Sequence, residues 1–191
     1  MSRKHGVTAE TYKRFAIDQG AIYRNYGKEN EMLLGATRGG STFTIEQDIR
    51  VMPVDGAKGD VKGSRRVISV RPLLVANFIE LSKDVLQLAI PGSSVADYPT
   101  TGTKTHDQLT RKIQIALSDY WDNITIVGEC SGSPTGYIEC GVLNALSEGN
   151  FELAYAENDE SVLTINIRGH FDPDDLDAEP WFVRFPVIPE S

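Results

Sequence analysis

The sequence is poor in the residues that build metal, redox and disulfide sites. Among its 191 residues are two cysteines, three histidines and two tryptophans. Cys130 and Cys140 form no CxxC pair, so we expect two free thiols in a reducing compartment. His5, His106 and His170 lie far apart, without a cysteine or carboxylate at ligand spacing, so we expect no metal site.

Long apolar segments and cofactor-binding motifs are also missing. No apolar run approaches the roughly 20 residues that cross a bilayer, and the first residues lack the apolar region of a secretory signal. We therefore expect a soluble chain without a membrane span, made in a cytoplasm. Residues 35–40 are glycine-rich but are not followed by GK[ST], and residues 131–133 are not a GxSxG elbow.

The acidic segment 172–177 resembles a calcium loop only superficially. It lacks the glycine and the distal bidentate glutamate that such a loop requires, so we interpret it as a solvated acidic turn. Carboxylates are plentiful in this chain, but nothing in their spacing indicates an acid/base pair. We predict no catalytic residue, no bound metal and no cofactor, and therefore no enzyme.

Positive charge is scarce overall and lies mainly in the first third of the chain. The net charge is −8, which argues against a general nucleic-acid binder. Residues 1–71 carry thirteen Lys and Arg against eight Asp and Glu, whereas residues 72–191 carry six against nineteen. One explanation of this uneven distribution is that charged residues on a solvated surface are spread by chance. The other is a basic and an acidic surface that attract each other when subunits stack head to tail.

The apolar pattern predicts a mainly β protein. Phe43, Ile45, Ile49 and Val51 alternate with polar residues, which is typical of a strand with one buried face. A helical turn at residues 143–146 is an alternative to the end of a strand there. Many strands and short turns favour an antiparallel β-sandwich or barrel. The other strands are expected at residues 21–24, 65–71, 109–117, 124–127, 137–143, 151–155, 163–171 and 181–187.

One flanking α-helix is expected at residues 73–90. Pro72 suits the first helical turn, and Pro91 followed by Gly92 ends the helix. The apolar residues that recur at steps of four and three are Leu74, Phe78, Leu81, Val85 and Leu88. Residues 92–107 are expected to form a polar loop. We divide the chain into an N-terminal arm, residues 1–19, and a single β domain, residues 20–191.

An exposed loop is predicted between the two early strands, at residues 52–64. Its central segment, residues 54–63, holds three glycines and four charged residues. Such a segment cannot pack into a core, so we expect a hairpin tip or a long loop.

Three segments occur in an order and spacing that span residues 20 to 172. The first is residues 20–27, continuing to residues 33–43. The second is the loop segment 54–63, and the third is residues 144–151 before the strand that ends at residues 169–172. Each segment alone is weakly specific. The ordered set resembles the major tail tube protein family of long-tailed, siphovirus-like bacteriophages.

The resemblance implies a compact β-sandwich or barrel with a flanking helix. It implies a structural virion protein that forms stacked hexameric rings, the conduit for DNA ejection, located in the tail and assembled in the host cytoplasm. The implied partners are further copies of itself, the tape-measure protein, the tail terminator and tail-tip proteins, and passing DNA bound without sequence specificity. In this family the long early loop contacts the next ring. We therefore expect intersubunit contacts at Arg50, Asp55, Lys58, Asp60, Lys62, Arg65 and Arg66.

Other functions fit the same strand pattern. The tube subunit of a contractile tail or of a secretion-type injection system is a related structural alternative. A carbohydrate-binding β-sandwich is an alternative of a different class, and it would need an exposed aromatic platform. Trp121 and Trp181 lie at strand margins and are more simply core residues. A hydrolase with paired carboxylates would need a cleft that the sequence does not indicate.

Overall fold

The computed structural model describes residues 6–8 and 10–187. This part of the chain holds ten β-strands, one α-helix and two short 3₁₀ helices, so the predicted mainly β fold with one helix is confirmed. The helical elements are η1 (Thr11–Arg14), α1 (Lys83–Ala89) and η2 (Leu117–Asp119). The strands are β1 (Ala16–Arg24), β2 (Met32–Leu33), β3 (Thr37–Val51), β4 (Arg65–Phe78), β5 (Ser93–Tyr98), β6 (His106–Arg111), β7 (Trp121–Cys130), β8 (Ser133–Glu148), β9 (Leu163–Arg168) and β10 (Trp181–Arg184).

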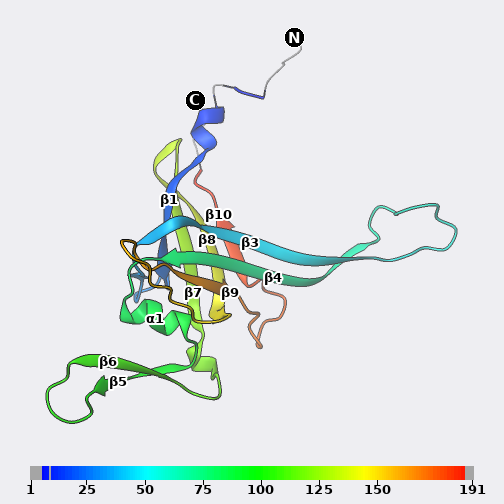
Figure 1. Cartoon of the computed structure of the whole chain (residues 1–191). Helices are drawn as coiled ribbons and strands as arrows, with labels where there is room; N and C mark the ends of the chain where they lie inside the picture. Colours follow the sequence, from blue (N-terminus) through cyan, green and yellow to red (C-terminus); the bar gives the residue numbers. More distant parts are fainter. Residues whose placement is uncertain (1–5, 9, 188–191) are drawn as a thin grey trace.

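The strands pair antiparallel throughout, as predicted. Eight of them form one continuous arrangement in which seven follow the order β2-β1-β7-β8-β9-β4-β3, with β10 paired to β8. The long strand β8 connects its two halves, because it pairs with β7 along most of its length and with β9 at residues 146–148. In Figure 1, β3 and β4 cross β1, β7 and β8 at a steep angle. The core lies where these two layers face each other.

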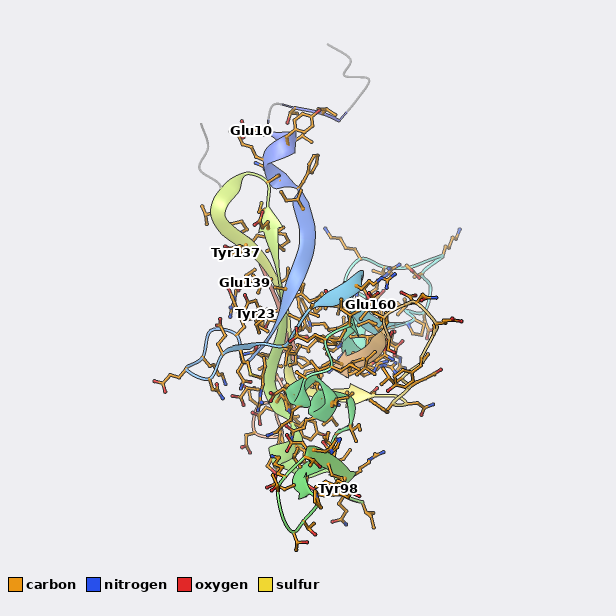
Figure 2. The ribbon with its side chains drawn as sticks, turned by 60° about the vertical axis from the view of Figure 1, so that its left-hand side comes forward. Glu10, Tyr23, Tyr98, Tyr137, Glu139 and Glu160 are labelled. Atoms are coloured by element: carbon orange, nitrogen blue, oxygen red, sulfur yellow. The ribbon has the colours of Figure 1, made fainter. Side chains whose placement is uncertain are left out.

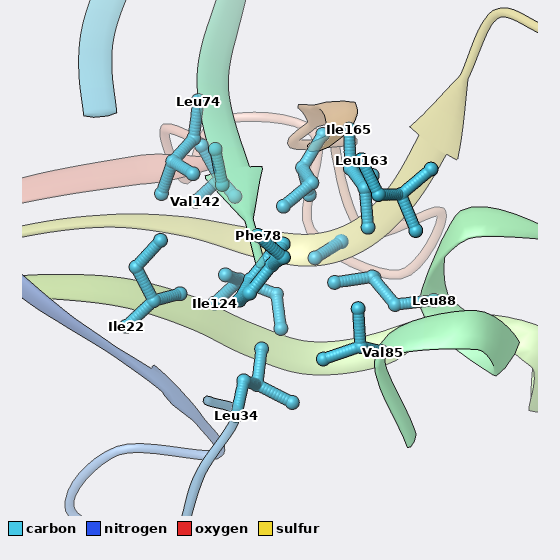
Figure 3. Close-up of a cluster of buried hydrophobic side chains, with 13 residues drawn as sticks. Ile22, Leu34, Leu74, Phe78, Val85, Leu88, Ile124, Val142, Leu163 and Ile165 are labelled. Atoms are coloured by element: carbon cyan, nitrogen blue, oxygen red, sulfur yellow. The ribbon is translucent and has the colours of Figure 1, made fainter. Parts of the chain in front are cut away.

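The core is one cluster of apolar side chains from both layers and the helix (Figure 3). Phe78 at the end of β4 is completely buried near its centre, and α1 covers one side with Val85 and Leu88. Burying a large apolar side chain contributes about 1.5–3 kcal/mol, so this cluster is the main source of stability. The other members are Ile22, Leu34, Leu74, Ala76, Ile124, Val142, Ala145, Leu163, Ile165 and Ile167.

The predicted helix at residues 73–90 is wrong in its first half. Residues 73–78 belong to β4, and the helix spans only Lys83–Ala89. Its start is set by Ser82, whose hydroxyl accepts a hydrogen bond from the backbone amide of Val85 at 3.2 Å. In the preceding stretch, complete burial occurs at every second residue, the period of a strand. These residues are Leu74, Ala76 and Phe78.

Two further expectations are corrected in the middle of the chain. Residues 92–107 are not simply a loop, because β5 pairs with β6 to form a second hairpin that stands apart from the main sheet. Figure 2 shows its Tyr98 at the opposite end of the molecule from Glu10. The strand expected at residues 109–117 ends at Arg111. The chain then leaves the hairpin, where the amide of Lys112 donates to the carbonyl of Gly92 at 3.0 Å.

The predicted strand at residues 151–155 is absent. This segment runs irregularly between β8 and β9, and Phe151 and Tyr155 are exposed. Only Leu153 packs against the core. An alternating pattern without a neighbouring strand to accept its backbone hydrogen bonds does not form a sheet.

The boundary expected at residue 19 cuts through β1. That strand begins at Ala16, opposite Cys130 of β7, so its first residues belong to the sheet. Residues 1–5 and 9 of the predicted arm lie outside the described residues. Cys130 and Cys140 are both free thiols, as predicted, and partial burial raises the pKa of the Cys140 thiol.

Candidate assembly interface

Two hairpins extend from the body, and the hairpin of β3 and β4 is the one with the longer strands. Its register runs from Thr37 opposite Phe78 to Val51 opposite Arg65. The first half lies on the core, and the second half projects outward (Figure 1). We call residues 49–68, which include the predicted loop 52–64, the distal hairpin. All of its residues are exposed except Ser64, whose carbonyl closes the loop by accepting from the amide of Met52 at 2.7 Å.

The distal hairpin is apolar as well as exposed. Seven of its apolar side chains lie in solvent, with exposed fractions from 38% at Val51 to 62% at Ile68. The expectation that Ile49 and Val51 occupy a buried face is therefore wrong for a single chain, because no second layer from residues 6–8 and 10–187 covers this part of the ribbon. Contiguous exposed apolar surface indicates an interaction site. The seven residues are Ile49, Val51, Met52, Val54, Val61, Val67 and Ile68.

A β-bulge marks the start of the distal hairpin. Asp48 lies opposite Ser69, whereas the next residue, Ile49, lies opposite Val67, so Ile68 is an extra residue on β4. Bulges bend a ribbon and redirect side chains. Here Ile68 borders a shallow depression of about 350 Å³, whose other lining residues are Arg50, Met52, Arg66 and Val67. The bulge thus forms a concave apolar surface with two guanidinium groups beside it.

The charges of the distal hairpin are poorly matched within the chain. Arg50 lies directly opposite Arg66, and like charges in that position repel each other. Arg65 forms an ion pair with Asp60 at 3.0 Å. Among the described residues, Arg50, Arg66, Lys58 and Lys62 form no ion pair within 4.0 Å. The distal hairpin carries five basic residues and two acidic ones. Four of the five basic side chains are therefore free to form ion pairs with another molecule.

The base of the same hairpin is held firmly by polar contacts. The carboxylate of Asp48 accepts hydrogen bonds from the Ser69 hydroxyl and the Arg71 guanidinium, both at 2.6 Å. Both contacts lower the pKa of the Asp48 carboxyl, and the hydrogen bond from Ser69 has the larger effect. Arg168 of β9 bridges Glu46 of β3 at 3.2 Å and Glu148 of β8 at 2.6 Å. The Asp48 contacts join β3 to β4, and the Arg168 contacts join the base of the hairpin to β8 and β9.

The sequence-predicted contact residues all lie on the distal hairpin. The fold brings two pairs of them together, Arg50 with Arg66 and Asp60 with Arg65. Asp55, Lys58 and Lys62 lie exposed on the loop, and their side chains form no hydrogen bond or ion pair with any described residue. Sequence reasoning missed the apolar half of this surface. The signal was the run of valine, isoleucine and methionine on both sides of a loop too polar to cover them.

Other kinds of site are less well supported. Among the described residues, no group of three or more His, Cys, Asp and Glu side chains is placed to hold a metal ion. No described helix is long and apolar enough to cross a bilayer. Trp121 packs against the core beneath the Arg24 guanidinium, 4.1 Å from the ring centroid. Trp181 is partly buried, and its indole donates to Glu179 at 2.9 Å, so the tryptophans form no exposed platform.

Comparison with known proteins gives no independent assignment. No protein-family model matches the sequence, and no curated protein matches it either. The features of the molecule that bear on function are therefore a small β body, a projecting hairpin, and an exposed apolar and basic surface on the distal half of that hairpin.

Proposed function

We propose that this protein is a structural subunit that polymerises into a tube of stacked hexameric rings, like the major tail tube protein of long-tailed bacteriophages. The observation that carries the proposal is the distal hairpin. It presents seven exposed apolar residues and an opposed arginine pair, and no other part of the described chain covers them. A subunit whose role is to join copies of itself requires such a surface.

The energetics favour association through this hairpin. Burying a fully exposed valine, isoleucine or methionine side chain stabilises a complex by about 1.5–3 kcal/mol. The seven side chains are 38–62% exposed, so each can contribute only about half of that amount. Ordering a flexible residue costs about 1–2 kcal/mol, but β3 and β4 are already paired up to Val51 and Arg65. Most of the ordering cost therefore falls on the loop between them.

The geometry also favours an open assembly rather than a closed dimer. The distal hairpin projects from one side of the body, and under this proposal it contacts a different surface of the neighbouring copy. Such heterologous contacts generate rings or filaments. β3 pairs only with β4 among the described strands, which leaves a 15-residue strand with an open edge. Open edges readily pair with strands of another chain, and this supports a sheet continued around a ring.

The charge distribution suits a conduit for DNA. The chain carries a net charge of −8, and an acidic inner wall would repel phosphate groups rather than hold them. Under this proposal the tape-measure, terminator and tail-tip proteins bind the assembled tube, and DNA passes through it. The proposed location is the virion tail, after assembly in the host cytoplasm.

Electron microscopy of the purified protein tests the proposal. We expect rings or tubes with a central bore in negative stain at high protein concentration. A matched variant, in which residues 52–64 are replaced by Asn-Gly, should remain folded and monomeric. Wild-type protein that stays a monodisperse monomer at high concentration, also with its tape-measure and tip partners present, would contradict the proposal.

A further inference from the structure

We propose that the distal hairpin of one copy docks on the acidic loop 171–179 of the next copy, which we call the acceptor loop. This inference rests on the proposed function and identifies the surface that receives the hairpin. The acceptor loop joins β9 to β10. It combines unmatched negative charge, an apolar depression and a backbone held at both ends.

The acceptor loop carries the strongest unmatched negative charge of the described chain. Its five acidic residues are all exposed, and there is no lysine or arginine between Arg168 and Arg184. None of the five forms an ion pair with a described residue. By contrast, Asp159 and Glu160 are matched by Arg38, at 2.6 and 2.8 Å. The five acidic residues are Asp172, Asp174, Asp175, Asp177 and Glu179.

Beside these carboxylates lies an apolar depression of about 540 Å³. Leu117, Tyr120 and Phe171 supply its apolar lining, and Asp172 and Asp174 also border it. The side chain of Leu117 is 79% exposed, although it is apolar. The depression therefore has the two properties of the distal hairpin in complementary form: apolar surface for apolar side chains, and carboxylates for ammonium and guanidinium groups.

The acceptor loop is held in place at both ends by β8. The amide of His170 donates to the carbonyl of Leu143 at 3.0 Å, and the amide of Leu143 donates to the carbonyl of Pro180 at 2.8 Å. The side-chain amide of Asn144 also donates to the carbonyl of His170 at 3.0 Å. Asn144 itself has a left-handed backbone, with φ of 46°. Because the surface is already ordered, a partner that binds it meets little entropic cost.

The occupant we infer is a second copy rather than the hairpin of the same chain. Within one chain the hairpin runs outward from the body, and no ion pair joins it to the acceptor loop. Lys58 and Lys62 lie in the same exposed loop as Val54 and Val61, so one element supplies both the apolar and the cationic groups. Docking of hairpin onto acceptor loop repeats from copy to copy and is heterologous, as a stacked assembly requires.

Reciprocal charge reversal tests this contact. One variant carries Lys58→Glu and Lys62→Glu, and a second carries Asp174→Lys and Asp177→Lys, two residues whose side chains form no described hydrogen bond. A third variant combines all four changes. The control, Glu152→Lys with Glu157→Lys, makes the same charge change on the exposed connection between β8 and β9. The readout is the protein concentration at half-assembly, measured by light scattering and sedimentation, with circular dichroism to verify folding.

We expect each reversed variant to raise the half-assembly concentration at least tenfold, and the fourfold variant to return it to within about threefold of wild type. The control should change it by less than about threefold. Tubes that form equally well in both reversed variants would overturn the docking and leave the proposed function standing. A third outcome is that the fourfold variant regains assembly while the wild-type protein forms only short oligomers. That outcome would support the docking and contradict the tube. Loss in both variants without rescue would also overturn the pairing.

Discussion

The two halves of β4 show how one strand serves two purposes. From Pro72 to Phe78 it lies between β3 and β9, and every second residue is completely buried. From Arg65 to Ile68 it pairs with β3 and with no other described strand, and all four residues are exposed. Both halves are rich in apolar side chains. The difference teaches that the apolar residues of the first half stabilise the monomer, whereas those of the second half are available to another molecule.

The largest loss of stability is expected for a substitution in the buried half of β4. Phe78→Ala should lower the free energy of unfolding by about 3–5 kcal/mol, because it removes a completely buried aromatic ring and leaves a cavity. Ile68→Ala, in the exposed half, should change the free energy by less than about 0.5 kcal/mol. Urea unfolding of both variants measures the contrast. Similar losses in the two would mean that the distal hairpin is packed against the body.

A second substitution sharpens the contrast on the assembly side. Ile68→Asp places a charge in the depression formed at the bulge, and we expect the half-assembly concentration to rise more than tenfold while unfolding stays unchanged. The matched control is Tyr155→Asp, at a side chain that is 84% exposed outside the hairpin. Equal assembly defects in the two variants would contradict a specific role for the distal hairpin.

Proteolysis reports whether assembly covers the hairpin. Trypsin should cut the free subunit first at Lys58 or Lys62, which lie on an exposed loop, and leave the body intact. In the assembled form the same sites should be cut at least about tenfold more slowly. Mass spectrometry of the earliest fragments identifies the site. Unchanged cleavage on assembly would show that the loop stays in solvent.

Salt should have a smaller effect than these substitutions. Exposed attractions are screened within about 10 Å at 0.1 M salt, so assembly should slow as the salt concentration rises from about 0.05 to 0.5 M. Light scattering over this range measures the change. Assembly that does not depend on salt would mean that apolar and backbone contacts are its main driving force. It would contradict a contribution from attraction between the basic hairpin and acidic groups of another copy.

The smallest expected effect concerns the base of the hairpin. The pKa of Asp48 is lowered in the folded chain, so its contribution to stability is present above the unfolded pKa of about 3.9 and disappears as the pH falls through the folded value. Asp48→Asn should therefore destabilise the protein slightly at pH 6 and by less at about pH 3, which lies below the unfolded pKa. Urea unfolding at both pH values measures the difference between variant and wild type, and a difference that grows in acid has the wrong sign.

Sequence reasoning identified most strands and misjudged the helix for a physical reason. Residues four apart, such as Leu74 and Phe78, share a face in a strand as well as in a helix, so the pattern did not distinguish the two. The β5–β6 hairpin escaped prediction because its residues are mostly polar and its stability comes from pairing with each other. Conversely, residues 151–155 alternate without any strand to pair with.

The candidate site was predicted in its charges and missed in its apolar part. A glycine-rich loop with unburied lysines is readable from the sequence, since it cannot enter a core. The exposure of Ile49, Val67 and Ile68 was not readable, because their alternation looks the same over a core as beyond its edge. Only the three-dimensional fold shows where the second layer stops. The acceptor loop likewise depends on Asn144 and Pro180, which lie far apart in the sequence.

The most direct test of the central claim is a high-resolution electron-microscopy map of the wild-type protein at concentrations where it associates. We predict a tube in which residues 49–68 of each subunit are buried against a neighbouring subunit. Monomers at every concentration, or an assembly in which the distal hairpin remains in solvent, would contradict the claim.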